Sequence, residues 1–276
     1  MGNRKPDGPE FVAPVQKLRL QYAKRGRLRF CSHRDFARAF ERSLRRAEVP
    51  MAYSAGFHPH PKISYLGAAP TGVGSEAEYL EIGLARRCEP EAVRAALDSV
   101  LPDGLDIVRA VDAQDCRPGT LAEQMHASLW RLELAADPAE LAAAVDRLVA
   151  AESVPVERLT KDGRRTLDAR APIVSAQVRP MPAEGSVGAS TEQQSGGVPV
   201  AAGNDTRAIL DVVVRQVTPA VRPDDVLTAL RTVAGFAPSQ PPRATRLAQG
   251  PVDDAGRVTD PLRSTEVPVS RAAPEY

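Results

Sequence analysis

Cysteine is scarce in this chain, and its spacing excludes several kinds of site. The 276 residues include three cysteines, Cys31, Cys88 and Cys116, which are widely separated and form no CxxC pair. So sparse a set implies neither a disulfide framework nor a four-cysteine zinc site. This cysteine usage predicts a protein of the reducing cytoplasm.

Long apolar runs and a strong net charge are also missing. No segment approaches the roughly 20 apolar residues of a membrane-spanning helix, and the polar first ten residues lack the apolar core of a signal peptide. The net charge is +1, so no overall field draws the chain to a membrane or to nucleic acid. We therefore expect a soluble protein with an ordinary core and no membrane partner.

Positive charge is nevertheless concentrated in one part of the chain. Between residues 17 and 64 lie twelve Lys and Arg residues against three Asp and Glu residues, a local excess of nine positive charges. Three of the four histidines lie in the same stretch. An excess of this size can bind a polyanion even when the whole protein is nearly neutral.

Hydrophobic periodicity predicts an α+β protein. In the first half the pattern predicts strands at 17–22, 62–66, 79–84 and 105–111, a brief extended segment at 28–30, and helices at 32–49 and 90–101. Ser32 followed by Asp35 is a capping-box variant, which places the start of the first helix at Ser32. The order β-α-β-β-α-β is that of the split βαβ, or ferredoxin-like, motif.

The second half repeats this rhythm. The pattern predicts strands at 128–134, 154–159, 166–178, 208–217 and 244–247, with helices that start at Asp137 and Pro223. Two tandem ferredoxin-like halves are the simplest account. The predicted divisions are a flexible tail at 1–15, a first half at 16–115, a second half at 125–250 with a flexible insertion at 180–205, and a disordered tail at 251–276.

The predicted helix after Ser32 carries basic residues along one face. Phe36, Phe40, Leu44 and Ala47 share the other face at helical spacing. We call the four basic residues the arginine stripe: Arg34, Arg38, Arg42 and Arg45. Guanidinium groups suit phosphate, and the rings of Tyr53 and Phe57 can stack on unpaired bases. Together with Lys62 these residues form a candidate site for RNA, tRNA or another phosphate-rich partner, with a simple solvated helix face as the alternative.

The histidines allow two further interpretations. A metal-independent ribonuclease needs a base, an acid and cations, which are roles open to His33, His58, His60 and Lys62 with Arg34. Four potential zinc ligands are also present, namely Cys31, His33, His58 and His60. Their basic surroundings oppose a metal cation, and local structural roles for the histidines are the simpler alternative to both.

A polar turn precedes the predicted strand at 79–84. It contains Gly72, Gly74, Ser75, Glu76 and Glu78. Carboxylates so close in sequence to the basic helix are expected to pair with the arginine stripe, which is a structural rather than a catalytic role.

Four strings of this region resemble a bacterial family of unknown function that is associated with radical S-adenosylmethionine (SAM) proteins. They are RFCSHRD at 29–35, FERSLRRA at 40–47, YSAGFHPHPKIS at 53–64 and GSEAEY at 74–79. The resemblance implies a radical-SAM enzyme as a partner, since such domains often lie at the C-terminus of one or are encoded beside one. It implies no activity for these residues, because the family has none established.

Radical-SAM chemistry by the chain itself is excluded. Three clustered thiolates must hold the iron–sulfur cluster, and the three cysteines here are too far apart in sequence. The order of elements is also similar to that of tandem-ferredoxin RNA-binding proteins, including CRISPR-repeat-processing ribonucleases, but a shared fold does not imply a shared function. The sequence therefore favours an accessory, RNA-binding module without a cofactor over an enzyme.

Overall fold

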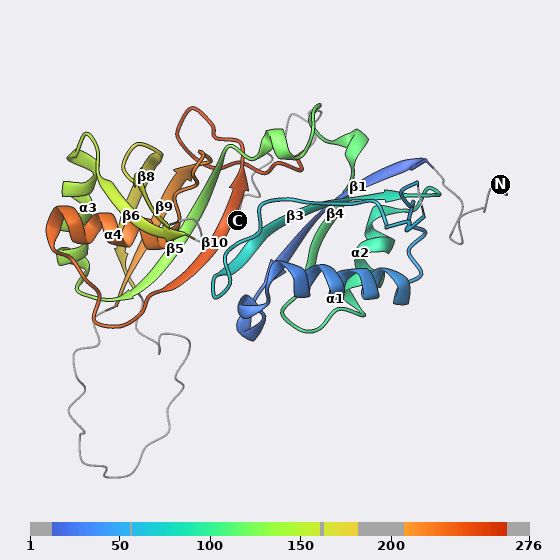
Figure 1. Cartoon of the computed structure of the whole chain (residues 1–276), viewed down its shortest axis with the longest axis horizontal. Coiled ribbons are helices and arrows are strands. Elements are labelled where there is room, and N and C mark those ends of the chain that lie inside the picture. Colours follow the sequence, from blue (N-terminus) through green and yellow to red (C-terminus); the bar gives the residue numbers. More distant parts are fainter. Residues whose placement is uncertain (1–12, 56, 161–162, 182–206, 264–276) are drawn as a thin grey trace, which may run out of the picture. The chain divides into compact units, whose positions relative to one another are not determined.

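A computed structural model describes residues 13–55, 57–160, 163–181 and 207–263 (Figure 1). The described residues form an α+β protein with four α-helices and ten strands. The chain divides into two compact units. Of the described residues, unit 1 comprises those within 13–125, 248–251 and 259–263, and unit 2 comprises those within 126–247 and 252–258.

Unit 1 is built on an antiparallel sheet. Its strands are β1 (Gln16–Lys24), β2 (Ile63–Tyr65), β3 (Gly74–Leu84) and β4 (Ile107–Asp112). β1 pairs with both β3 and β4, and β2 pairs with β3, so the order is β4-β1-β3-β2. These elements follow the predicted chain order, whereas the assignment of two ferredoxin-like halves stays a prediction.

Two helices of unit 1 pack on one face of this sheet. They are α1 (His33–Arg46) and α2 (Pro90–Asp98). Leu18, Leu20 and Tyr22 alternate along β1 and join the core that the helices cover, and the Tyr22 and Phe36 rings stack with centroids 4.1 Å apart. As predicted, Ser32 caps α1, where its Oγ accepts a hydrogen bond from the Asp35 N–H at 3.2 Å.

The opposite face of the sheet is covered by irregular chain. A second cluster of buried side chains joins Ala77 and Tyr79 of β3 to Leu121 and Met125, which follow β4. Leu262, 1% exposed, completes this cluster. The structure describes residues 251–263 of the predicted tail, where this apolar side chain is buried, and residues 264–276 lie outside the described residues.

Unit 2 contains three antiparallel strands of the eight-stranded sheet, a hairpin and two helices. β5 (Ala127–Ala135), β9 (Arg207–Arg215) and β8 (Ile173–Pro180) pair in that order. The helices are α3 (Pro138–Ala150) and α4 (Pro223–Ala234), and the hairpin is formed by β6 (Pro155–Thr160) and β7 (Gly163–Asp168). The last strand, β10 (Arg243–Gly250), has residues in both units.

One further prediction is wrong, and two others concern residues that the structure does not describe. The segment at 28–30, predicted as extended, belongs to a 3-10 helix, η1 (Gly26–Phe30), because backbone bonds such as Leu28 N–H to Arg25 O turn the chain. The predicted N-terminal tail up to residue 12 and the insertion from residue 182 lie outside the described residues. Among the described helices, none is long and apolar enough to span a membrane.

Candidate nucleic-acid interface

The arginine stripe lies along the exposed side of α1. All four of its side chains are exposed, whereas Phe36, Phe40 and Leu44 are buried on the opposite side. The eleven residue steps from Arg34 to Arg45 extend about 16 Å along the helix axis at 1.5 Å per residue. Because the stripe and the core contacts alternate with helical periodicity, packing α1 on the sheet turns all four arginines to solvent.

No ion pair involves the stripe among the residues that the structure describes. The acids predicted to neutralise it have other partners. Glu76 accepts a hydrogen bond from Arg25 Nε at 2.8 Å, and hydrogen bonding to Glu76 raises the pKa of Arg25. Glu78 is buried, and its carboxylate accepts the Ala69 N–H at 3.1 Å. The predicted pairing of these glutamates with the arginine stripe is therefore wrong.

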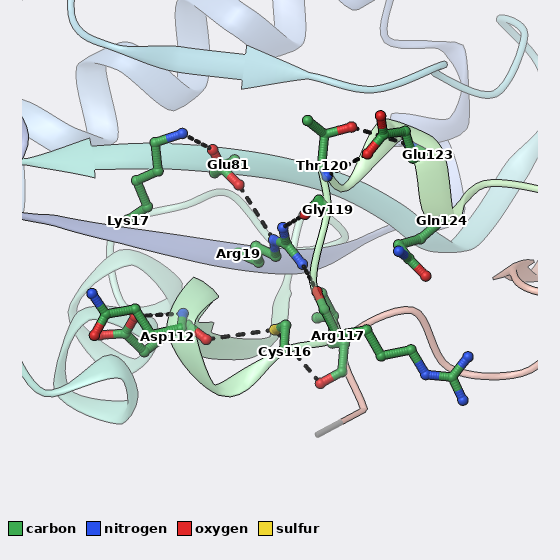
Figure 2. A network of polar contacts seen from close by, with 12 residues as sticks. Lys17, Arg19, Glu81, Asp112, Cys116, Arg117, Gly119, Thr120, Glu123 and Gln124 are labelled. Carbon is green, nitrogen blue, oxygen red and sulfur yellow. Dashed lines mark hydrogen bonds and ion pairs between the residues drawn. The ribbon is translucent and has the colours of Figure 1, made fainter. Parts of the chain in front are cut away.

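Arg19, unlike the arginine stripe, has a structural role and is fixed by several polar contacts (Figure 2). Its side chain is 4% exposed, its Nε lies 3.3 Å from the Glu81 carboxylate, and it donates to the Gly119 carbonyl at 2.6 Å. Lys17 lies 2.9 Å from the same carboxylate. Arg19 thus ties β1 to the segment after β4, and the sequence signal was its place between Leu18 and Leu20 in the alternating strand.

The same segment buries Cys116. Its Sγ lies 3.5 Å from the Asp112 carbonyl, and burial raises the pKa of the thiol. A thiol with a raised pKa is a poor nucleophile at neutral pH. Cys116 therefore belongs to the packing of unit 1.

His33 occupies the first position of α1 and is exposed. Its ring meets the Tyr65 ring edge-on, with centroids 5.1 Å apart. The Tyr65 hydroxyl is buried without a hydrogen-bond partner among the described residues, and burial raises the pKa of this phenol. His33 therefore packs against an aromatic ring that also contacts Phe36 and Phe40.

The loop that follows α1 is closed by backbone pairing. Tyr53 and Pro61 form an antiparallel bridge, and Ser54 N–H donates to the His60 carbonyl at 2.8 Å. His60 N–H in turn donates to Ser54 Oγ at 3.0 Å. The paired stems present Phe57, 73% exposed, together with the exposed side chains of His58 and His60.

The predicted metal ligands form no cluster in the described part of the chain, and the catalytic roles of His33, His58, His60 and Lys62 stay predictions. No group of three or more His, Cys, Asp and Glu side chains there is placed to hold a metal ion. The Cys31 thiol is half-buried beside the Ser32 carbonyl, and burial raises its pKa. Lys62 is half-buried, and its backbone pairs with that of Gly83 and Ala52. His33 has a ring contact with Tyr65 and none with either loop histidine among the same residues.

Phe30 is a surface residue that the sequence interpretation did not single out. Its side chain is 58% exposed immediately before α1. The Arg29 guanidinium carbon lies 4.5 Å from its ring centroid, a cation–π geometry. The adjacent Arg-Phe pair in a basic stretch was the available signal.

A comparison with known protein families finds a bacterial family that matches most of this chain. Residues 17–223 match the family described as "Uncharacterized protein conserved in bacteria (DUF2344)". The chain belongs to the DUF2344 family. The matched residues include the whole arginine stripe and the loop after α1. No curated protein matches this DUF2344 chain.

Proposed function

We propose that this protein binds RNA through the arginine stripe of α1. The observation that carries the proposal is the difference between this stripe and three basic residues on or directly after β1. Lys17, Arg19 and Arg25 are paired with carboxylates, whereas no described acid pairs with the stripe. A row of exposed, uncompensated guanidinium groups is the electrostatic footprint of a phosphate-binding surface.

The geometry of α1 suits a chain of phosphates. Arg34, Arg38 and Arg42 follow one another at intervals of four residues, so their positions repeat about every 6 Å along the helix axis. Each fork of donors can bind a phosphate oxygen pair. The exposed rings of Phe30, before α1 in the chain, and Phe57, in the loop after it, add surfaces on which bases can stack, as in many RNA-binding modules.

Charge reversal within the stripe tests the proposal. Binding of the full chain to fluorescently labelled, unfractionated tRNA is measured by anisotropy from 50 to 300 mM salt. We expect the Arg38→Glu/Arg42→Glu variant to lose at least tenfold in affinity and the slope of log K against log salt to fall by about 1.5, since each lost phosphate contact contributes about 0.7 to 0.9.

A control with the same change of charge separates the stripe from the overall field. Arg147 on α3 and Arg231 on α4 are exposed and lie in the last turns of their helices. The Arg147→Glu/Arg231→Glu variant is expected to bind tRNA nearly as well as the wild type. Equal losses in the two double variants, or none in the stripe variant, would refute the proposal.

We also propose that the protein acts as an accessory to a radical-SAM enzyme, which rests on the resemblance of the four strings at 29–35, 40–47, 53–64 and 74–79. The shared substrate would be the bound RNA. The test is affinity purification of the tagged full chain from its native host, with and without ribonuclease treatment. Recovery of a protein with a CxxxCxxC cluster motif is expected, and its absence from both preparations would remove the accessory role.

A further inference from the structure

We infer that unit 2 has a binding site for an α-amino acid with an anionic side chain. The site is a cavity of about 220 Å³ where β5 ends and β9 begins. Its lining includes Glu133, Ala135, Arg207, Gln240 and Arg243, all of which belong to unit 2. The inference is independent of the arginine stripe, which lies in unit 1.

The strand register brings the lining of this cavity together. Arg207 lies directly opposite Ala135 in the pairing of β5 with β9. Glu133 is two residues before Ala135, so its side chain is on the same face of the sheet as that of Arg207, at the diagonal position. The chain returns to this point after α4, where the Ser239 N–H and Oγ both donate to the Ala135 carbonyl, at 3.3 and 3.1 Å. Arg243 follows, and three separate segments therefore meet around one cavity.

The charged groups of the cavity have no ion pair with any residue that the structure describes. Elsewhere on the same face of the sheet, opposite charges do pair, since Arg131 donates to Asp211 at 2.8 Å. Glu133 is half-buried, and Arg207 and Arg243 are exposed. The carboxylate and the two guanidinium groups thus line one hollow without neutralising each other, which leaves all three available to a ligand. A few polar groups converging on a concave surface are typical of small-molecule sites.

The kinds of charge indicate the ligand. A guanidinium group binds a carboxylate or phosphate through two parallel N–H donors, so Arg207 and Arg243 suit a ligand with two anionic groups. The ionised Glu133 can only accept hydrogen bonds, and an ammonium group is the donor that complements it. Together the three side chains have one net positive charge. An α-amino acid with an anionic side chain has the matching groups and one net negative charge.

The volume of the cavity agrees with a ligand of this size. Since each water molecule takes about 30 Å³ in the liquid, the cavity has room for about seven waters. An acidic amino acid, with roughly ten non-hydrogen atoms, displaces a similar volume. A nucleotide has more than twice as many atoms and is too large for it. The site therefore differs from the proposed RNA surface in the class of molecule that it admits.

Titration calorimetry of the full chain compares four probes. L-Glutamate and O-phospho-L-serine have the inferred set of charges, whereas glutarate lacks the amino group and L-glutamine lacks the second anionic group. We expect at least one of the first two to bind about tenfold more tightly than either glutarate or L-glutamine, because a charged partner left unsatisfied costs about that factor. The tighter of the two identifies the anionic group of the side chain.

Variants of the lining test the role of each group. Arg207→Gln and Arg243→Gln should each weaken the binding of that amino acid about tenfold. Glu133→Gln should weaken it by a similar factor but leave glutarate binding unchanged, because glutarate has no ammonium group for the carboxylate to bind. Arg147→Gln, at an exposed position of α3, is the matched control and should bind as the wild type does.

Three results would refute the inference. They are no binding of either amino acid, wild-type affinity in all three lining variants, and equal affinity for glutarate and L-glutamate that Glu133→Gln does not change. Far-UV circular dichroism verifies that the variants remain folded, as expected for positions at the surface. Binding of tRNA by the arginine stripe is measured separately, so a failure of this inference leaves the proposed function standing.

Discussion

Arg19 and Arg42 lie in neighbouring elements of unit 1 and have opposite surroundings. Arg19 is buried between the Glu81 carboxylate and the carbonyls of Arg117 and Gly119. Arg42 is exposed on α1, and its neighbours one helical turn away are Arg38, Arg45 and Arg46. One arginine therefore has structural partners, whereas the other is surrounded by like charges, which is the arrangement that the proposed phosphate-binding surface requires.

The same substitution, arginine to glutamine, can be made at both positions, and at position 19 it should reduce the free energy of unfolding the most. Arg19→Gln leaves the Glu81 carboxylate without its buried partner and two carbonyls without donors, so we expect a loss of about 3 kcal/mol in the free energy of unfolding. Urea denaturation measures it. A loss below about 0.5 kcal/mol would mean that Lys17 alone satisfies Glu81, and the distinction between the two arginines would fail.

Arg131 of unit 2 is a third arginine, and like Arg19 it has a carboxylate partner. Arg131 donates to both Asp211 carboxylate oxygens, at 2.8 and 2.9 Å. Burial by itself raises the pKa of Asp211, but the hydrogen bonds and charge of Arg131 outweigh burial, so the pKa lies below its usual value. We expect Asp211→Asn to cost about 2 kcal/mol at neutral pH.

The pH dependence of this cost has a definite sign. Because the folded pKa of Asp211 is depressed, its contribution is fully present above the unfolded pKa of about 3.9 and is lost as the pH falls through the folded value. The difference between wild type and Asp211→Asn should therefore shrink below about pH 4. Asp146→Asn, at an exposed position of α3, is the control; a pH-independent difference at position 211 would contradict the prediction.

A smaller effect is expected from the cap that starts α1. Ser32→Ala removes the acceptor of the Asp35 N–H and should cost about 1 kcal/mol. Ser64→Ala, at an exposed position of β2, provides a control expected to be nearly neutral. Thermal unfolding of both variants measures the difference, and equal midpoints would show that the cap is dispensable for placing the arginine stripe.

Arg42→Gln should change the free energy of unfolding the least, and it should increase it. Arg42→Gln removes repulsion from three like charges at positions i−4, i+3 and i+4, each worth about 0.2–0.5 kcal/mol on a helix. We expect a gain of about 0.6 kcal/mol at low salt, the lower end of the sum of three such pairs, that disappears at high salt because exposed charges are screened. A loss of stability at low salt would show that Arg42 has a structural partner after all.

Much of the local structure could be predicted from the sequence. The alternation around Leu18 and Leu20, the Ser32 cap and the spacing of Phe36, Phe40 and Leu44 predicted β1 and α1 with their buried faces, and the structure confirms them. These signals are local, since a strand or helix with one apolar face has a fixed periodicity. The 3-10 helix at 26–30 was missed because its short turns have no comparable period.

The partners of the charged groups could not be predicted in the same way. By sequence, Glu76 and Glu78 were assigned to the arginine stripe, and Arg19 was one basic residue among twelve. Ion pairs form across strands that the chain brings together from 50 or more residues away, as with Arg25 and Glu76 or Arg19 and Glu81. No pattern within one segment carries that information.

Hydrophobic periodicity within β1 and α1 is enough to predict which of their faces are apolar, and so which arginines can reach solvent. Which of these arginines are neutralised depends on the tertiary fold, because the pairing of β1 with β3 brings Glu81 to Arg19 and the folding of the 67–78 segment withdraws Glu76 and Glu78 from α1. Burial and hydrophobic periodicity are properties of a segment, whereas charge compensation depends on which segments meet.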